Sequence, residues 1–481
     1  MPPARTRIAP SPTGDPHVGT AYQALFCYAL AHQTGGQFIM RLEDTDQARY
    51  SPDSDKRIFA ALKWTGLYYD EGPDVGGPYA PYRQSERLPL YREHAERLVA
   101  RGHAYYCFCT RERLAALRKE QEARHEPTGY DGHCRALPPA DVAARLAAGE
   151  SHVIRLRVPD EGVTTFYDVV RGEISFENSK LEDAVLLKSD GFPVYHLAVV
   201  VDDHLMRVTH ITRGEEWISS TPLHVLLYSF FGWEPPVFAH TPLLLNNDRT
   251  KISKRKSPEK TSLEGFRTNG YLPEALLNFL ALLGWSHPEG KEVFGLDEFM
   301  HMFSLDRILK AGSVFDLTKL QWLNGVYIRA LSLDELAARL EPYTQYPPDK
   351  VREVLPLLQD RLKLLTEFDH LAVVFFEEPA YDLSLFATKQ FSPAEVRNHL
   401  AAVRAWMEPL PWPWPHDDWE EGMRRLATDL GYRKAGDLFM LLRVAVTGRK
   451  ETPPLHGTML ALGRDATLRR IDAALRALAQ A

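Results

Sequence analysis

The sequence predicts an α/β fold in which a parallel-sheet domain is split by an inserted α+β domain and followed by mostly α-helical domains. Three observations predict it: a strand–helix–strand pattern opens the chain, strand-like runs return near residue 197, and helical spacing dominates beyond about residue 330. At 481 residues the chain exceeds what one hydrophobic core usually serves, so we expect two to four domains. A composition of 44% hydrophobic and 25% charged residues is typical of a fully folded globular protein.

The opening half begins with a predicted strand at Thr6 to Ala9. A turn rich in proline, serine and glycine follows, then an amphipathic run from Ala21 to Ala31 predicts a helix and Phe38 to Leu42 predicts a second strand. Because a helix between two strands is typical of parallel pairing, these segments predict a parallel sheet.

The second half of the same sheet is expected shortly after residue 195. The valine-rich run Leu197 to Val201, which ends in Asp202-Asp203, is interpreted as a strand, and Val208 to Ile211 as the next one. Between the halves lie three cysteines, a charged helical run from Arg111 to Arg124, and the strand-like alternation of Val153 to Val158. This stretch is therefore interpreted as a separate inserted domain.

The last 150 or so residues are predicted to be mostly helical. Segments such as Leu333 to Leu340 place apolar residues at helical spacing. Proline-containing loops at 346–348 and 409–415 divide this part into at least two helical units.

Charge and cysteine content limit the class of protein. The 57 basic and 64 acidic residues leave a net charge of −7, which argues against a protein coated in nucleic acid but allows local basic patches. We expect neither secretion nor a membrane span, because the first residues lack an apolar core and no apolar run approaches about 18 residues. Only four cysteines occur, which suits a reduced compartment, so a cytoplasmic location is expected.

The first chemical motif runs from Pro10 to Thr20, as Pro-Ser-Pro-Thr-Gly-Asp-Pro-His-Val-Gly-Thr, between the first strand and the helix. Gly14 and Gly19 allow a close backbone approach, and His17 can donate a hydrogen bond to a phosphate. The N-terminus of the following helix presents free N–H groups and the positive end of its dipole. These features favour ATP, and the alternative is a proline-rich turn with a surface histidine.

The second motif is Lys251-Ile252-Ser253-Lys254-Arg255-Lys256, which follows the apolar run Leu243 to Leu245 and a polar loop. A basic run met alone is typical of a solvated face. Beside a triphosphate, the same run would supply cations.

Together the two motifs resemble the paired signatures of class I aminoacyl-tRNA synthetases, the HIGH-type motif at 16–20 and the KMSKS-type loop at 251–255. The resemblance extends to the glutamyl branch through segments at 7–14, 41–46, 130–132, 200–203, 213–216, 270–278 and 283–286. It implies an enzyme that ligates L-glutamate to the 3′ end of tRNA(Glu) in two steps, through a glutamyl-adenylate formed from ATP, with release of pyrophosphate and AMP.

The resemblance also implies how the chain is divided. The split catalytic domain would be Rossmann-like and would occupy 1–93 and 196–245, around an acceptor-binding (connective) domain at 94–195. A stem-contact region with the KMSKS-type loop would occupy 246–330, and helical anticodon-binding subdomains 331–380 and 381–481.

Adenylate formation needs no protein nucleophile, so catalysis should be positioning plus neutralisation of charge on the phosphates, with Mg²⁺. The resemblance assigns catalysis to His17, Lys251, Ser253 and Lys254, and ATP binding to Pro16, His17, Gly19, Thr20, Glu216, Leu244 and Lys254. Glutamate would be bound by Arg7, Ala9, Ser11, Glu43, Tyr195, Val199 and Arg213. Two alternatives stay open: Glu43 could be a strand-end carboxylate paired to Arg41, and Tyr195 could be a core aromatic residue.

The cysteine group resembles a structural zinc site known in part of this family. Its ligands would be Cys107, Cys109, Tyr130 and Cys134, with His133 as the alternative to Tyr130, and the other interpretation is three buried thiols. Arg361 is predicted to read an anticodon base, although a solvated helix arginine is the alternative.

The expected partners are tRNA(Glu), L-glutamate and ATP, with no membrane, and the expected state is a monomer. Three rival functions are compatible with the family: an enzyme that also charges tRNA(Gln), a shortened relative that glutamylates a modified tRNA base, and a catalytically silent paralogue. The long C-terminal half argues against the second and the two intact motifs argue against the third.

Overall fold

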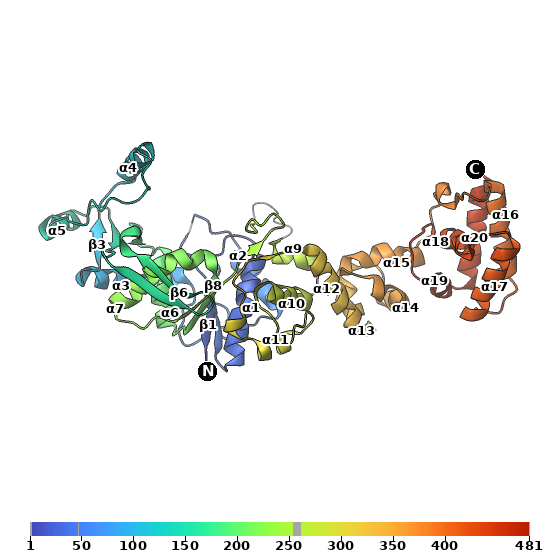
Figure 1. The fold of residues 1–481 in the computed structure, drawn as a ribbon, viewed down its shortest axis with the longest axis horizontal. Coiled ribbons are helices and arrows are strands. Elements are labelled where there is room, and N and C mark those ends of the chain that lie inside the picture. Colours follow the sequence, from blue (N-terminus) through green and yellow to red (C-terminus); the bar gives the residue numbers. More distant parts are fainter. Residues whose placement is uncertain (1, 47, 254–260, 481) are drawn as a thin grey trace. The chain divides into compact units, whose positions relative to one another are not determined.

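The computed structural model describes residues 2–46, 48–253 and 261–480, and it divides into two compact units. Unit 1 comprises Met1–Thr268 and Pro273–Leu320, and unit 2 comprises Asn269–Leu272 and Gln321–Ala481 (Figure 1). The finer division into six segments stays a prediction. Within the described ranges, no helix has both the length and the apolar character needed to cross a membrane.

The opening strand–helix–strand unit is confirmed. Strand β1 (Arg5–Ile8) pairs in parallel with β2 (Gln37–Met40), and α1 (Val18–Gln33) connects them. Helix α1 is buried on most of its surface, because it lies between β1 and β8 on one side and helix α10 on another. The buried helix fixes the position of its own N-terminus at the carboxyl end of β1.

The sheet continues through strands from the second half of unit 1. Beside β1, the Thr209 N–H donates to the Arg5 carbonyl (3.0 Å), where β8 (His210–Gly214) begins. Strand β8 pairs in parallel with β9 (Val237–Thr241), and β9 pairs in parallel with the end of β5 (Val163–Asp168). The carboxyl ends of β1, β8, β9 and β5 therefore share one edge, where ligands of open α/β sheets bind.

The predicted strand at Leu197 to Val201 is wrong, because these residues lie in helix α6 (Tyr195–Leu205). The valines suggested a strand, but every residue from Leu197 to Asp203 is buried, and tertiary packing overrides the propensity. The helix also has a geometric consequence. Successive side chains of a strand point to opposite faces, whereas here the adjacent Asp202 and Asp203 both reach Arg41, at 3.6 and 2.7 Å.

The inserted segment contains a second, smaller sheet. Antiparallel strands β3 (Ala104–Cys107), β4 (Val153–Leu156) and β7 (Val185–Leu187) form it, as the alternation at 153–158 predicted. Helices α4 (Arg111–Ala123) and α5 (Pro139–Ala147) have no buried residue and extend away from this sheet (Figure 1).

The other elements of unit 1 surround these sheets. They are α2 (Ser54–Thr65), η1 (Gln84–Glu86), α3 (Leu88–Ala100), β6 (Gly172–Glu177), η2 (Asn178–Lys180), η3 (Glu215–Ser220), α7 (Thr221–Phe231), β10 (Leu244–Leu245), α9 (Leu263–Thr268), α10 (Pro273–Gly284), α11 (Leu296–Met302), η4 (Leu305–Arg307) and β11 (Ser313–Val314); α12 (Leu317–Ala330) leads into unit 2.

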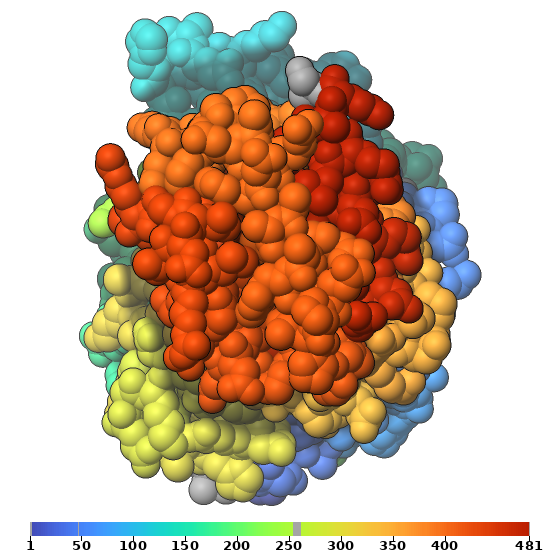
Figure 2. All heavy atoms as spheres, turned by 90° about the vertical axis from the view of Figure 1, so that its right-hand side faces the viewer, coloured from blue at the N-terminus to red at the C-terminus, as the bar shows by residue number. Residues whose placement is uncertain are grey.

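The described residues of unit 2 form helices joined by loops, with no strand among them, as the spacing of apolar residues predicted. Two of its helices begin with complete capping boxes, Ser332–Glu335 and Ser392–Glu395, which satisfy backbone N–H groups at the helix start. Figure 2 shows the closely packed atoms of the C-terminal helices, coloured orange to red. The helices of unit 2 that come after α12 follow in chain order. They are α13 (Leu333–Leu340), η5 (Glu341–Tyr343), α14 (Pro348–Leu358), η6 (Gln359–Arg361), η7 (Leu365–Glu367), α15 (Phe368–Phe376), η8 (Leu383–Phe386), α16 (Pro393–Met407), α17 (His416–Asp429), α18 (Ala435–Thr447), α19 (Leu455–Leu462) and α20 (Arg464–Ala479).

Two adjacent glycines in the turn from α1 to β2 provide a matched test of this packing. A Cβ on Gly36 would overlap the backbone carbonyl of Ala4, which cannot move without displacing β1, so Gly36→Ala should lower the melting temperature strongly. Gly35 has open space around it but a φ of 68°, so Gly35→Ala should cost only about 1–2 kcal/mol. Differential scanning calorimetry measures both, and an unchanged melting temperature for Gly36→Ala would contradict the close approach.

Candidate functional site

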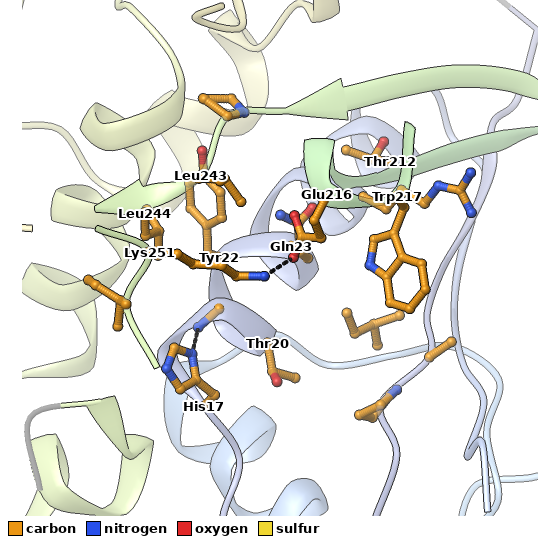
Figure 3. Close-up of a pocket in the computed structure, with 18 of the residues that line it drawn as sticks. His17, Thr20, Tyr22, Gln23, Thr212, Glu216, Trp217, Leu243, Leu244 and Lys251 are labelled. Carbon is orange, nitrogen blue, oxygen red and sulfur yellow. Dashed lines mark hydrogen bonds and ion pairs between the residues drawn. The ribbon is translucent and has the colours of Figure 1, made fainter. Parts of the chain in front are cut away.

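A pocket of about 400 Å³ opens at the carboxyl edge of the parallel sheet, within unit 1. It lies against the N-terminal end of α1, the ends of β1 and β8, and the segment that follows β10 (Figure 3). Its volume is in the range of small-molecule and cofactor sites. His17 and the run Lys251 to Ser253 both line it, so two motifs separated by more than 230 positions meet at one cavity.

His17 is the N-cap of α1. Its Nδ1 accepts a hydrogen bond from the Gly19 N–H (2.9 Å), and its carbonyl accepts one from the Thr20 N–H (2.7 Å). A Cβ on Gly19 would lie 3.1 Å from that Nδ1, so glycine keeps the cap undistorted. No acidic residue occupies the first turn of α1, and the positive end of the helix dipole therefore faces the pocket without an internal counter-charge.

An ion pair crosses the pocket wall. Lys251 Nζ lies 2.9 Å from Glu216 Oε1, and Figure 3 shows the two side chains meeting between η3 and the segment after β10. About half of the Lys251 side chain is exposed, so its ammonium can exchange this partner for an anion in the pocket. Lys254 lies outside the described residues, and its assigned role stays a prediction.

Arg7 and Arg41 are buried beneath the pocket and share one counter-ion. Asp203 accepts from Nε and Nη2 of Arg7 (3.2 Å each) and from Nη1 of Arg41 (2.7 Å). Burial alone would raise the pKa of Asp203, but the two guanidinium groups outweigh it and hold that pKa below its ordinary value. Among the described residues, Nη1 of Arg7 has no hydrogen-bond acceptor, and Arg7 lines the pocket.

Glu43 forms the pair with Arg41 that the sequence offered as one interpretation, while its role in glutamate binding stays a prediction. Its carboxylate lies 3.2 Å from Nη2 of Arg41, and Glu43 also lines the pocket. Burial raises the pKa of Glu43 above its ordinary value, although Arg41 and Arg7 act in the opposite direction. Arg41 therefore holds in place a carboxylate that belongs to the pocket wall.

Arg213 also lines the pocket, near the end of β8. Its guanidinium donates to the hydroxyls of Tyr195 (3.0 Å) and Thr221 (2.8 Å), and its other contacts are ring nitrogens of His224 and His240. Tyr195 is therefore a hydrogen-bonded wall residue whose ring centroid lies 4.6 Å from that of Trp217. All of these partners are neutral groups when the histidines are unprotonated.

Most of the predicted site residues converge on this pocket. The lining includes Arg7, Ala9, His17, Gly19, Thr20, Glu43, Tyr195, Arg213, Glu216, Leu244, Lys251 and Ser253. Three predicted residues are not part of the lining: Pro16 is buried in the preceding turn, Ser11 is exposed, and Val199 is buried within α6. Their assigned roles stay predictions.

Sequence reasoning missed Tyr22, Gln23, Thr212 and Trp217, which also line the pocket (Figure 3). Tyr22 and Gln23 follow the first motif within the next turn of α1, and Trp217 directly follows Glu216. Helical spacing after the N-cap could have identified Gln23, whose amide donates to Thr241 (2.8 Å).

The three cysteines of the inserted segment form a compact cluster. The sulfur atoms of Cys107, Cys109 and Cys134 lie within 4.8 Å of one another, and those of Cys109 and Cys134 are 3.6 Å apart. Zinc–sulfur bonds of about 2.3 Å place thiolates about 3.8 Å apart at the corners of a tetrahedron. The Tyr130 hydroxyl lies 3.4 Å from the Cys107 sulfur and 3.7 Å from the Cys109 sulfur, so the donor set fits a tetrahedral metal.

Arg361, at the end of η6 in unit 2, is exposed. It makes no hydrogen bond or ion pair with any residue in the described parts of the chain, so its guanidinium is available to a ligand. The same observation fits a solvated arginine, and both interpretations stay open.

Two family models match the chain. The model described as "tRNA synthetases class I (E and Q), catalytic domain" matches residues 3–322, and the one described as "Anticodon binding domain" matches residues 335–475. Among curated proteins, a glutamate–tRNA ligase of Thermus thermophilus is 50% identical, with 98% of this chain and 99% of that protein covered. A glutamate–tRNA ligase of Acidothermus cellulolyticus is 48% identical, with 97% and 94% covered.

Solved structures agree with these matches. A glutamate tRNA ligase from Elizabethkingia meningosepticum, crystallised in complex with its amino acid, superposes with a TM-score of 0.90 at 35% identity and covers 99% of this chain and 100% of its own. A glutamate-tRNA synthetase from Elizabethkingia anophelis gives a TM-score of 0.88 at 34% identity, with 98% and 99% covered.

The shared counter-ion gives a pH-dependent prediction. Since the folded-state pKa of Asp203 lies below its ordinary value of 3.8, its contribution to the free energy of unfolding is present above about pH 4 and is lost as the pH falls below 3.8. Asp203→Asn should remove about 3–5 kcal/mol at neutral pH, because two buried guanidinium groups lose their carboxylate. Its melting temperature should then fall less than that of the unsubstituted protein between pH 4 and pH 2.

The control for this measurement is Asp46→Asn, which removes an exposed carboxylate paired to Arg49 and should change the melting temperature little. Equal acid sensitivity of Asp203→Asn and the unsubstituted protein would contradict the assignment.

Proposed function

This chain belongs to the glutamate–tRNA ligases, which are class I aminoacyl-tRNA synthetases, and from that premise we propose that glutamate and ATP react in the pocket between α1 and β8. The enzyme ligates L-glutamate to the 3′ end of tRNA(Glu) through a glutamyl-adenylate, and it releases pyrophosphate and AMP. This location is supported by one observation: His17, Lys251 and the buried Arg7 and Arg213 all line the same cavity.

The phosphates of ATP would lie against the N-terminus of α1. There the positive end of the helix dipole and His17 favour negative charge, and Lys251 can turn from Glu216 toward a phosphate. Ser253 and Lys254 belong to the same predicted loop. Mg²⁺ would bind phosphate oxygens together with one or two carboxylates, for which Glu216 is available, and would neutralise charge on the departing pyrophosphate.

Glutamate would bind between the two buried arginines. Arg7 has Nη1 left for the side-chain carboxylate, and Arg213 would meet the other carboxylate. Tyr195 accepts a hydrogen bond from Arg213, so its own hydrogen can be donated to the side-chain carboxylate. Glu43, with Ser11, would accept from the ammonium group, which needs a negative partner in a buried site.

Unit 2 would bind the anticodon end of tRNA(Glu), since the anticodon-binding family model covers most of it. Arg361 is proposed to read an anticodon base there, because its exposed guanidinium is available to donate hydrogen bonds to the acceptor atoms of a base. The chain is further proposed to act as a monomer in the cytoplasm.

A structural zinc ion is proposed for the inserted segment. Cys107, Cys109, Cys134 and Tyr130 would hold it in a closed four-ligand site, which leaves no position for a substrate. Its effect would be to stabilise the strand end at Cys107 against the loop that carries Cys134.

Aminoacylation of purified tRNA(Glu) with glutamate tests the proposed pocket when His17 is varied. His17→Ala should lower kcat about a hundredfold, because the imidazole acts on charge that grows in the transition state. His17→Asn is the matched control for structure, since asparagine is also a good N-cap and preserves the start of α1. It should be impaired nearly as much.

Full activity of His17→Asn together with loss in His17→Ala would reduce His17 to a helix cap. The same assay with tRNA(Gln) decides whether the enzyme also charges that tRNA. Absence of charging of tRNA(Glu) by the unsubstituted protein would contradict the function itself.

Metal analysis of the purified chain tests the zinc site. About one zinc per chain is expected, and Cys109→Ser should lower that content while it destabilises the inserted segment, since structural zinc contributes directly to folding. Cys27→Ala is the matched control, because Cys27 is buried in α1 of the catalytic fold, and its zinc content should be unchanged. Finding no zinc in the unsubstituted protein would reduce the cluster to three buried thiols.

A further inference from the structure

Three side chains from neighbouring strands form a row at the carboxyl edge of the sheet. Asp168 ends β5, His240 lies near the end of β9, and Arg213 lies near the end of β8. In the parallel register of β8 and β9, Arg213 is directly opposite His240, and β5 meets β9 at Asp168 and Phe238. The topology therefore brings an acid, an imidazole and a guanidinium into line beside the pocket.

Hydrogen bonds determine the tautomer of the central imidazole. Oδ1 of Asp168 accepts from the N–H groups of Val170 (2.9 Å) and Arg171 (2.8 Å), and Oδ2 accepts from the N–H of His240 (3.0 Å). With all those donors the carboxyl is ionised, so Nδ1 of His240, at 2.6 Å from Oδ2, must carry the hydrogen. Nε2 is then an acceptor, and it receives Nε–H of Arg213 at 3.0 Å.

Asp168 and His240 hold the Arg213 side chain in place without neutralising its positive charge. Both Asp168 and His240 are completely buried, yet no carboxylate lies within ion-pair distance of the Arg213 guanidinium in the described parts of the chain. Arg7 differs, because Asp203 contacts it directly. A buried guanidinium that has only neutral acceptors keeps its full charge for a ligand, and it needs one to offset its desolvation.

We propose that Asp168 and His240 are positioning residues for glutamate recognition: Asp168 fixes the His240 tautomer, and His240 holds Arg213 in the orientation that meets a substrate carboxylate. The inference rests on the proposed function, and it adds two residues that lie behind Arg213 and are not themselves part of the pocket lining. A direct Asp–Arg pair at this place would hold the arginine equally well, but it would compete with the carboxylate of the substrate. Because the His240 imidazole lies between them, Asp168 still determines the orientation of Arg213, but its negative charge does not contact the guanidinium in place of the substrate carboxylate.

Substitutions at both positions separate this role from simple packing. In Asp168→Asn the amide NH₂ group must face either the two backbone N–H groups or the His240 imidazole. If it faces the imidazole, it donates to Nδ1, so the ring hydrogen moves to Nε2, which then faces Arg213 as a donor instead of an acceptor. His240→Leu fills the site without an acceptor. His240→Gln retains a donor for Asp168 and an acceptor for Arg213, and it is the conservative rescue.

The experiment is steady-state aminoacylation of tRNA(Glu) with the full chain, with KM measured separately for glutamate and ATP, and with melting temperature as the check on folding. Asp168→Asn and His240→Leu should raise the KM for glutamate about tenfold to a hundredfold, as expected for hydrogen bonds to a charged group. The KM for ATP should stay within about twofold. His240→Gln should recover most of the affinity, and Thr165→Val, an exposed position on the same strand β5, should match the unsubstituted enzyme.

Three results would overturn the inference. One is an unchanged KM for glutamate in Asp168→Asn. Another is a parallel rise of both KM values with a lower melting temperature, and the third is equal impairment of His240→Gln and His240→Leu. If the unsubstituted chain fails to charge tRNA(Glu), both the proposed function and this inference are contradicted. If it charges tRNA(Glu) normally and the variants behave like it, only this inference is contradicted.

Discussion

The structure depends on burying arginine side chains beneath a pocket. A buried guanidinium is costly to desolvate unless a carboxylate or several acceptors meet it. Asp203 provides most of this compensation. It is fully buried and forms ion pairs with both Arg7 and Arg41. The orientation of β1, β2 and α6 follows from that requirement, because one strand supplies Arg7, the residue after the next strand supplies Arg41, and the helix supplies the acid.

The two arginines that face the cavity are supported in opposite ways, and the difference bears on specificity. Arg7 is anchored by a direct ion pair and offers one remaining nitrogen, while Arg213 is anchored by hydroxyls and imidazoles and offers its whole charge. With Glu43, these two arginines give two cationic positions and one anionic position, apart from the Lys251–Glu216 ion pair elsewhere in the lining. That pattern matches an amino acid with two carboxylates and one ammonium group, which is the charge distribution of glutamate.

The sequence predicted the opening strand–helix–strand unit, the inserted sheet and the helical C-terminal half, because each depends on local periodicity. It failed at Leu197 to Val201, where the valines suggested a strand and the chain forms a helix. Local propensity could not reveal that both Asp202 and Asp203 must reach Arg41, some 160 positions earlier. The pocket residues Gln23 and Trp217 were missed for a related reason, since their side chains belong to the site only through the position of α1 and η3.

What the sequence by itself determined is the family and the identity of the two motifs, because short runs such as Pro16 to Thr20 and Lys251 to Ser253 carry their chemistry in the order of their residues. Only the tertiary structure decided which charges are compensated. Whether an arginine meets a carboxylate or a neutral imidazole depends on which strand lies beside it and in what register, as Arg213 and His240 show. Electrostatic interactions act over a few ångströms in space, whereas the groups involved are separated by tens to hundreds of residues along the chain.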